Sequence, residues 1–344
     1  MGRDPESFDA IELFDSIGRK YNLDLNDERA SRAVLKKFAT AVRASRANPI
    51  ILHGRRVELM FGFVAVALGG CRIVKREDAG EVASSDSDLI APDYRLVLNS
   101  GPELFVEVKN CYTKGLNPTL EFKDDYLQKL ERYAALFGKP LKLAVYWSRW
   151  NLWTLVPTSA LTRSGADRQS LTFTVALKRN EMVDLGDVML GTTPPLIVRL
   201  VADPTKPRHI GKARKAVFTI GDVRFFAGGV EITDRAERSL AFYLMAYGGW
   251  PEDPPSSRIE NNELDWIEFA HRPVETEESH GFEFVSHVST MISRRYNDLT
   301  TSGHAITRLA PPVEPKTLAV NIPGRVADLT LPLWVFHMKP SPDP

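Results

Sequence analysis

The chain has 344 residues, of which 43% are hydrophobic and 26% charged, the composition of an ordinary soluble globular protein with room for two domains. Its 44 basic and 44 acidic residues give a formal net charge of zero, so attraction to nucleic acid can come only from local patches. The two cysteines, Cys71 and Cys111, lack the spacing of a disulfide framework or a zinc site. Because no signal-like or membrane-spanning apolar segment is visible, we expect a cytoplasmic protein.

Two helices are predicted first, over 5–20 and 27–46, where apolar residues recur at helical spacing. Asn48-Pro49 interrupts this pattern, and a third, mostly apolar helix is predicted from about 55 to 68. That helix contains Glu58, a carboxylate that is costly to bury unless it meets a cation or hydrogen-bond donors. Pairing with Arg55 or Arg56 at the helix edge is the alternative to a role in a site.

Residues 71–75 are predicted as a strand, and a hairpin follows a polar loop over 76–88. The hairpin arms, 92–98 and 103–109, are rich in β-branched and aromatic residues, and the Asn-Ser-Gly-Pro between them is typical of a turn. The second arm carries Glu107 and Lys109, and side chains two apart on a strand point to the same face. A carboxylate and an ammonium group therefore lie side by side on an otherwise apolar strand.

The register of this hairpin decides how an aspartate joins the pair. A loop centred on Gly101 places Asp93 opposite Lys109, whereas a loop centred on Ser100 places it opposite Glu107. Both registers bring an Asp, a Glu and a Lys together, and both remain open.

Two carboxylates at hydrogen-bonding distance repel each other unless a hard cation lies between them, and oxygen ligands suit Mg2+ or Mn2+. Such an ion can polarise a phosphodiester and activate a water. Lys109 would orient or deprotonate that water, or neutralise charge on the phosphate. Asp88 is the reserve for Asp93, because it lies five residues further out and beyond a proline that interrupts pairing.

Asp93, preceded by a proline and followed fourteen residues later by Glu107-Val108-Lys109, resembles the signature of the PD-(D/E)XK nucleases, which include many restriction endonucleases and Holliday-junction resolvases. The resemblance implies that Asp93, Glu107 and the carbonyl of Val108 bind Mg2+ or Mn2+, and that Lys109 serves the attacking water. These nucleases often have a helix with a glutamate before the sheet, and Glu58 matches by position.

The clearest helix is predicted over 119–137, and strands are predicted after it over 141–147 and 152–156. The order of elements over about 50–157 is then the αβββαβ order of the restriction-endonuclease-like core. The resemblance therefore implies an α/β fold with this core, preceded by N-terminal helices and followed by an α+β region.

Several branches of this family have a glutamine and a tyrosine on the helix after the Glu-x-Lys strand, which makes Gln128 a candidate catalytic residue. Tyr133 lies one residue further along than the family spacing requires and is more typical of core packing. Lys123 and Lys129 of the same segment are candidates for contacting the DNA backbone.

Beyond residue 157, short β-like runs over 171–177, 196–201, 216–220 and 223–226 predict a β-rich module. Its segment 206–215 has five basic residues and no acid, which indicates either a phosphate-contacting loop or a solvated one. The candidate nucleic-acid-binding residues are Arg208, Lys212, Arg214 and Lys215.

Helices are predicted over 260–272 and 282–297, and strands over 317–322 and 328–337. This order suggests a winged-helix-like module. The expected domains are an N-terminal helical extension (1–48), the nuclease domain (49–157), the β-rich module (158–232) and an α+β domain (233–344).

The leading hypothesis is a Mg2+-dependent endonuclease that acts on DNA rather than RNA, in a prokaryotic restriction, defence, repair or recombination setting. A homodimer is expected, because cutting both strands with one site per chain needs two subunits. The alternatives are a nuclease-fold subunit that binds or assembles with little activity, an RNA or single-strand nuclease, and a transcription-factor-like protein that uses the winged-helix element.

Overall fold

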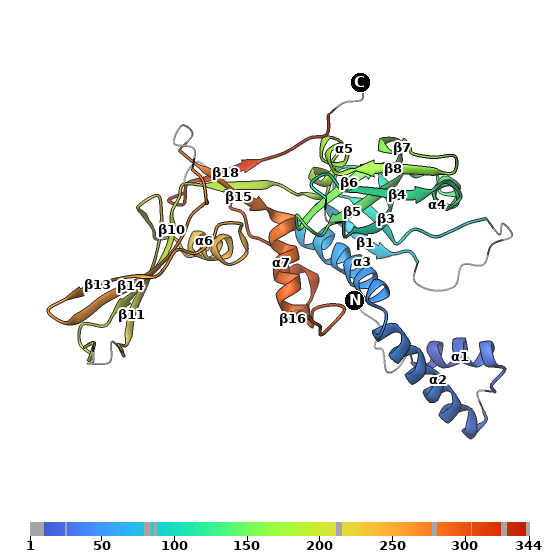
Figure 1. Ribbon diagram of the computed structural model, residues 1–344, viewed down its shortest axis with the longest axis horizontal. Coiled ribbons are helices and arrows are strands. Elements are labelled where there is room, and N and C mark those ends of the chain that lie inside the picture. Colours follow the sequence, from blue (N-terminus) through green and yellow to red (C-terminus); the bar gives the residue numbers. More distant parts are fainter. Residues whose placement is uncertain are drawn as a thin grey trace. The chain divides into compact units, whose positions relative to one another are not determined.

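The computed structural model describes residues 10–24, 26–78, 84, 88–113, 115–210, 215–276, 281–303, 305–324 and 329–341 (Figure 1). The chain divides into two compact units, Met1–Arg56 and Val57–Pro344. Within the part of the chain that is described, no helix is both long and apolar enough to cross a membrane.

The first unit is helical, as predicted, with α1 (Ala10–Tyr21), α2 (Glu28–Arg46) and the beginning of α3 (Pro49–Leu68). The carboxylate of Asp27 caps α2 by accepting the N–H of Arg29 at 2.8 Å. Helix α3 begins earlier than the predicted residue 55, because Asn48 and Pro49 start the helix instead of interrupting it. The Asn48 side chain accepts the N–H of Ile50 at 3.0 Å, and proline is favoured in the first helical position.

The second unit begins with a sheet that contains the predicted hairpin. Its strands are β1 (Cys71–Arg76), β2 (Tyr94–Leu98), β3 (Glu103–Cys111), β5 (Leu141–Trp147) and β6 (Leu152–Pro157), in the order β1-β2-β3-β5-β6. Strands β3 and β5 are parallel and the other neighbours are antiparallel. The succession α3, β1, β2, β3, α4 (Asp124–Leu136), β5 follows the predicted order of elements, with the short β4 (Thr119–Lys123) inserted before α4.

Helices α3 and α4 pack on opposite faces of this sheet, because residues of β3 alternate between the faces. Val106 lies in one core cluster with Phe61 of α3, whereas Phe105 lies in another with Leu130 of α4. The Tyr94 hydroxyl also donates to the backbone carbonyl of Glu58 at 3.0 Å, which fixes α3 against β2.

Two elements of this region differ from the prediction. The helix expected over 119–137 begins only at Asp124, because residues 119–123 pair as β4 with β8 (Arg168–Thr172). The strand expected over 171–177 ends at Thr172, whose hydroxyl accepts the N–H of Val175 and caps the short helix α5 (Phe173–Lys178).

The rest of the unit is α+β. In chain order, its remaining elements are a 3-10 turn at Thr158–Ala160, β7 (Thr162–Arg163), a 3-10 turn at Met182–Leu185, β9 (Met189–Thr192), β10 (Leu196–Ala202), β11 (Ile220–Ala227), β12 (Val230–Ile232), α6 (Arg235–Tyr247), β13 (Ser256–Glu260), β14 (Glu263–His271), β15 (Glu283–His287), α7 (Val288–Thr300), β16 (Thr301–Ser302), β17 (Ala305–Ile306), a 3-10 turn at Pro315–Leu318, and β18 (Leu333–Phe336). The sheets are ordered β4-β8-β7, β12-β11-β10-β14-β13, β15-β9-β18 and β16-β17.

The predicted helix over 260–272 is wrong, because this segment is mainly strand β14. Asn261 and Asn262 adopt φ values of 50° and 62° and form the tight turn of a β13–β14 hairpin. The strand expected over 317–322 starts as a 3-10 turn instead, and the one expected over 328–337 is confined to Leu333–Phe336. The winged-helix-like module is therefore not supported, because one predicted helix is mainly strand β14 and one predicted strand starts as a 3-10 turn.

A single core cluster joins the first sheet to the C-terminal half. It contains Phe61 of α3, Trp153 of β6 and Ile292 of α7. The indole N–H of Trp153 donates to the Ser293 hydroxyl at 2.9 Å, and both side chains are fully buried. The face of the sheet that carries α3 is therefore completed by a helix far along the chain.

Candidate active site

One end of the first sheet carries the predicted site, because the start of β2 and the ends of β1 and β3 lie together there. Tyr94 pairs with Val106, so the hairpin is centred on Ser100 and Asp93 lies opposite Glu107. Of the two registers that the sequence allows, the structure has the one that sets the two carboxylates across from each other.

Asp93 lies just before β2 and is held there by two hydrogen bonds. Its Oδ2 accepts the backbone N–H of Val108 at 2.7 Å, and its own carbonyl accepts the N–H of Glu77 at 2.9 Å. Burial, together with the nearby negative charge of Glu107, raises the pKa of Asp93 to about 8, against the opposing effect of the Val108 hydrogen bond. Near neutral pH, and without a cation, this carboxyl therefore retains its proton.

Glu107, Lys109 and Tyr126 form a compact hydrogen-bonded triad. Glu107 is only 4% exposed, and its Oε1 accepts hydrogen bonds from the Lys109 ammonium and from the Tyr126 hydroxyl. The ammonium also donates to the Tyr126 oxygen at 2.9 Å. Burial lowers the pKa of Lys109, but Glu107 and Tyr126 more than offset it, so the net shift is upward. Lys109 is thus a fixed cation beside a buried carboxylate.

A second group of carboxylates includes Asp93. Oxygens of Glu58, Asp78 and Asp93 lie within 4.8 Å of one another, and Glu58 is only 9% exposed. Arg76, the last residue of β1, has its Nη2 at 3.6 Å from Glu58 and 3.4 Å from Asp78. Oxygen-only ligands in this number suit Mg2+ or Mn2+. The structure thus places Glu58 near Asp93, the position that the resemblance implies. Glu58 also forms an ion pair with Arg76.

Sequence reasoning missed Asp78 and Tyr126. Asp78 follows the first strand at the same sheet end as Asp93, a position that an antiparallel β1–β2 pairing could have indicated. Tyr126 looks like one more apolar residue in the stripe of an amphipathic helix, and only its contact with Glu107 reveals the role of its hydroxyl.

The structure does not bring Gln128 to this cluster. It is exposed on α4, and two residues along a helix correspond to a rotation of about 200°, so it points away from the face that carries Tyr126. Tyr133 is buried core, stacked edge-on against Phe105, and its hydroxyl donates to Glu77 at 2.9 Å.

Asp88, the reserve ligand, lies apart with its side chain 57% exposed. It pairs with Arg132 at 3.5 Å and more distantly with Lys129 at 3.9 Å. Lys129 also pairs with Asp125 at 2.9 Å. The geometry therefore favours Asp93 over Asp88.

The remaining candidate cations are dispersed. Lys123 is exposed at the end of β4, and Lys215 is exposed beside the β-rich sheet. Arg208 is engaged in ion pairs with Glu263 at 2.9 Å and Asp265 at 2.6 Å. Lys212 and Arg214 lie outside the described residues.

Comparison with known proteins finds a weak structural likeness to a nuclease. No family model and no curated protein matches the chain. Among solved structures, the chain is similar to Hjc, a Holliday junction resolvase from the archaeal hyperthermophile Archaeoglobus fulgidus. The match has 25% sequence identity and a TM-score of 0.24, and it covers 31% of this chain and 80% of that chain. Hjc is a nuclease of the kind that the sequence motif resembles, but a likeness this weak carries no weight beside the side chains and distances of the site.

Proposed function

We propose that this protein is a metal-dependent nuclease that hydrolyses phosphodiester bonds of DNA, with a restriction-endonuclease-like core over about 50–157. The observation that carries the proposal is the set of Asp93, Glu107 and Lys109 at one end of the sheet, in which Glu107 is buried, Asp93 and Lys109 are half-buried, and Asp93 lies opposite Glu107 in the hairpin register. Burying like charges so close together is unfavourable unless a cation joins them.

The charges of the site fit one divalent cation. Four carboxylates and two cationic groups are gathered there, namely Glu58, Asp78, Asp93, Glu107, Arg76 and Lys109. When all are ionised, four negative and two positive charges leave two negative charges, the charge that one Mg2+ or Mn2+ neutralises. Asp93 and Glu107 would hold the ion together with the carbonyl of Val108, and Glu58 and Asp78 would add oxygens on the side of α3.

A bound divalent ion would supply Lewis acidity toward the phosphate and lower the pKa of a coordinated water. The protein's own residues arrange the rest. Lys109 keeps its proton because its pKa is raised, so it acts as a hydrogen-bond donor that orients the water or stabilises charge on the phosphate. Tyr126 positions the Lys109 ammonium and the Glu107 carboxylate relative to each other.

The resemblance to restriction endonucleases and resolvases favours a role for such an activity in restriction, defence, repair or recombination. Cutting both strands of a duplex with one such site per chain requires two copies, so we include a homodimer in the proposal.

The test is cleavage by the purified full chain of plasmid, linear duplex, single-stranded DNA and RNA, each with Mg2+, Mn2+ or EDTA. We expect metal-dependent cutting that Lys109→Ala lowers by about 10²–10³-fold, the usual cost of removing a charge-stabilising donor. Lys139→Ala is the matched control, because Lys139 pairs with Glu103 at the other end of β3, at 3.6 Å. Cutting that persists in Lys109→Ala, or no cutting of any substrate, would overturn the proposal.

A further inference from the structure

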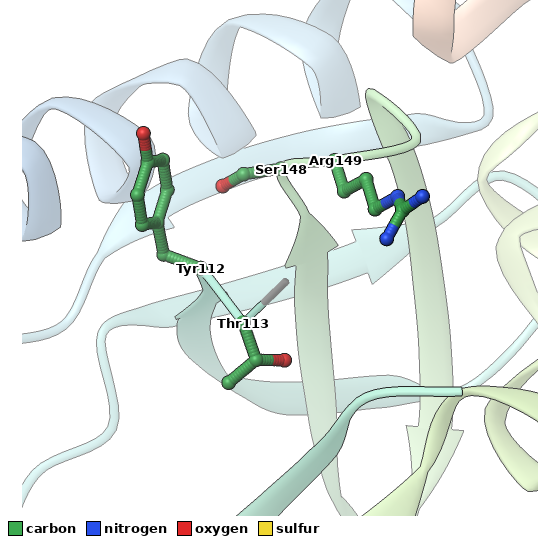
Figure 2. Close-up of a pocket in the computed structure, with 4 residues that line it drawn as sticks. All are labelled: Tyr112, Thr113, Ser148 and Arg149. Carbon is green, nitrogen blue, oxygen red and sulfur yellow. The ribbon is translucent and has the colours of Figure 1, made fainter. Parts of the chain in front are cut away.

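A pocket lies beside the proposed active site, where the parallel strands β3 and β5 end together. Cys111 and Trp147, the last residues of the two strands, are paired. Immediately beyond them, Tyr112, Thr113, Ser148 and Arg149 line a pocket of about 500 Å³. Figure 2 shows the Ser148 hydroxyl directed toward the Tyr112 ring, with the Arg149 guanidinium on the other side of Ser148.

The pocket and the acidic cluster share one end of the sheet. Asp93 lies on one side of β3, across from Glu107, and β5 borders β3 on the other side. Along β3, Tyr112 follows Lys109 by three residues, which is about 10 Å at the rise of an extended strand. Because adjacent strand residues point to opposite faces, Ser148, which bonds the Asn110 side chain, lies on the face of β3 opposite to Lys109.

The wall formed by the turn after β5 is preformed. The N–H of Ser148 donates to the carbonyl of Cys111 at 3.1 Å, and the Ser148 hydroxyl bonds the side chain of Asn110. Further along the turn, the carbonyl of Asn151 accepts the Thr290 hydroxyl at 2.8 Å. A ligand therefore meets this wall in a fixed shape, which reduces the entropy lost on binding.

The exposed groups of the pocket are aromatic and cationic. Tyr112 is 78% exposed, although a ring of this size is usually at least half-buried. The Arg149 guanidinium lies 5.3 Å from the centre of the Trp150 ring, which itself stacks on Phe173 with an angle of 3° between the planes. An exposed ring, a guanidinium and the Thr113 hydroxyl are the surface and donors that bind a nucleobase and its phosphate.

We propose that this pocket binds one unpaired nucleotide of the nucleic-acid substrate, with its base stacked on Tyr112 and its phosphate paired with Arg149. A base in an intact duplex is stacked on both sides and cannot reach Tyr112, so the pocket selects single strands, overhangs, gaps or branch points over continuous duplex. The position of the pocket relative to cleavage rests on the proposed function, whereas nucleotide binding does not.

The experiment uses the full chain with a single-stranded DNA 20-mer that carries the fluorescent base 2-aminopurine, and a blunt duplex of the same sequence, in Ca2+. We expect 2-aminopurine fluorescence to be quenched on binding, as a base stacked on an aromatic ring is. Tyr112→Leu should weaken single-strand binding by about 5- to 150-fold, the usual range for loss of one base–aromatic stack, and leave duplex binding unchanged.

Two further variants separate stacking from damage to the fold. Tyr112→Phe keeps the ring and should retain binding and quenching. Leu116→Ala changes another exposed residue of the same loop and should behave as the wild type.

Arg149→Ala should weaken single-strand binding and reduce its salt dependence, because one phosphate contact is lost.

The outcomes distinguish the two proposals. Metal-dependent cutting with Tyr112→Leu equal to the wild type in single-strand binding would overturn the pocket assignment and leave the nuclease intact. Ring-dependent binding without any cutting would uphold the pocket and overturn the nuclease. No binding of single strands by the wild type, or equal quenching in Tyr112→Leu, would also overturn the pocket assignment.

Discussion

Asp93→Asn is the substitution that most directly tests whether the site is built for a cation. The carboxyl of Asp93 has a pKa of about 8 in place of the ordinary 3.8 because it is buried close to Glu107. Between pH 4 and pH 8 the folded protein therefore holds a proton that the unfolded chain has released. The stability of the metal-free protein accordingly falls as pH rises through this window and is level above it.

The size of the effect follows from the same values. At about 1.4 kcal/mol for each pKa unit, a rise from 3.8 to about 8 corresponds to about 6 kcal/mol of destabilisation above pH 8. The asparagine amide is still buried and still accepts the Val108 N–H, so we expect Asp93→Asn to recover about half of this, about 3 kcal/mol. For a unit of this length, that raises Tm by about 5 °C or more at pH 8.5 in EDTA.

The assay is thermal unfolding of the wild type and Asp93→Asn at pH 5 to 9, with EDTA or with Mg2+. At pH 5 the wild type has regained about 4 kcal/mol, so Asp93→Asn should there be about 1 kcal/mol less stable than the wild type. Mg2+ should stabilise the wild type increasingly up to about pH 8 and should have little effect on Asp93→Asn. Asp125→Asn, which changes a carboxylate that is 77% exposed, controls for loss of charge. A metal-free Asp93→Asn protein that is less stable at pH 8.5, or a gain independent of pH, would refute the reasoning.

Two other substitutions probe the supports of the site. Tyr126→Phe removes the hydroxyl that joins Glu107 and Lys109. In steady-state cleavage we expect kcat to fall about 10- to 100-fold with little change in KM for DNA, and in thermal unfolding little change in Tm. An unchanged kcat would contradict the positioning role. Gly62→Ala places a Cβ 2.6 Å from the Tyr94 hydroxyl and should cost about 1–3 kcal/mol in urea unfolding, because α3 is pressed against β2 there. Gly54→Ala, in the same helix with nothing within 4 Å, should instead stabilise by about 0.5–1 kcal/mol, and similar effects of the two variants would show that α3 is not held in this way.

The local parts of the candidate site could be read from the sequence. The two-residue spacing of Glu107 and Lys109 fixes a shared face whatever surrounds the strand, and turn chemistry locates the hairpin. The register could not be chosen, because loops centred on Ser100 and on Gly101 both keep Pro102 out of the ladder. Its choice depends on how β2 meets β1 and α3, which is a property of the folded unit.

Elements whose partners lie far along the chain were harder to predict. Residues 119–123 continue the helical pattern of α4 but pair with β8, whose residues lie 45 to 53 positions later, and this pairing outweighs helix propensity. Strand β14 is half-buried on both faces, so its alternation is weak, and its pairing with β10 is not visible locally. Tyr126 was missed for a similar reason, since an aromatic residue on an apolar helix stripe gives no sign that its hydroxyl is used.

The hydrogen bond between Trp153 and Ser293 bears on the order in which the protein folds. It spans 140 residues, and Ile292 beside it belongs to the same core as Phe61. While the chain is being synthesised, the sheet that holds Asp93 and Glu107 has no α7 to pack against until residue 293 has left the ribosome, and such long-range contacts form slowly. The carboxylates of the candidate site are therefore fixed in place only late in synthesis, so that a nascent, incomplete chain carries them without the packing that aligns them.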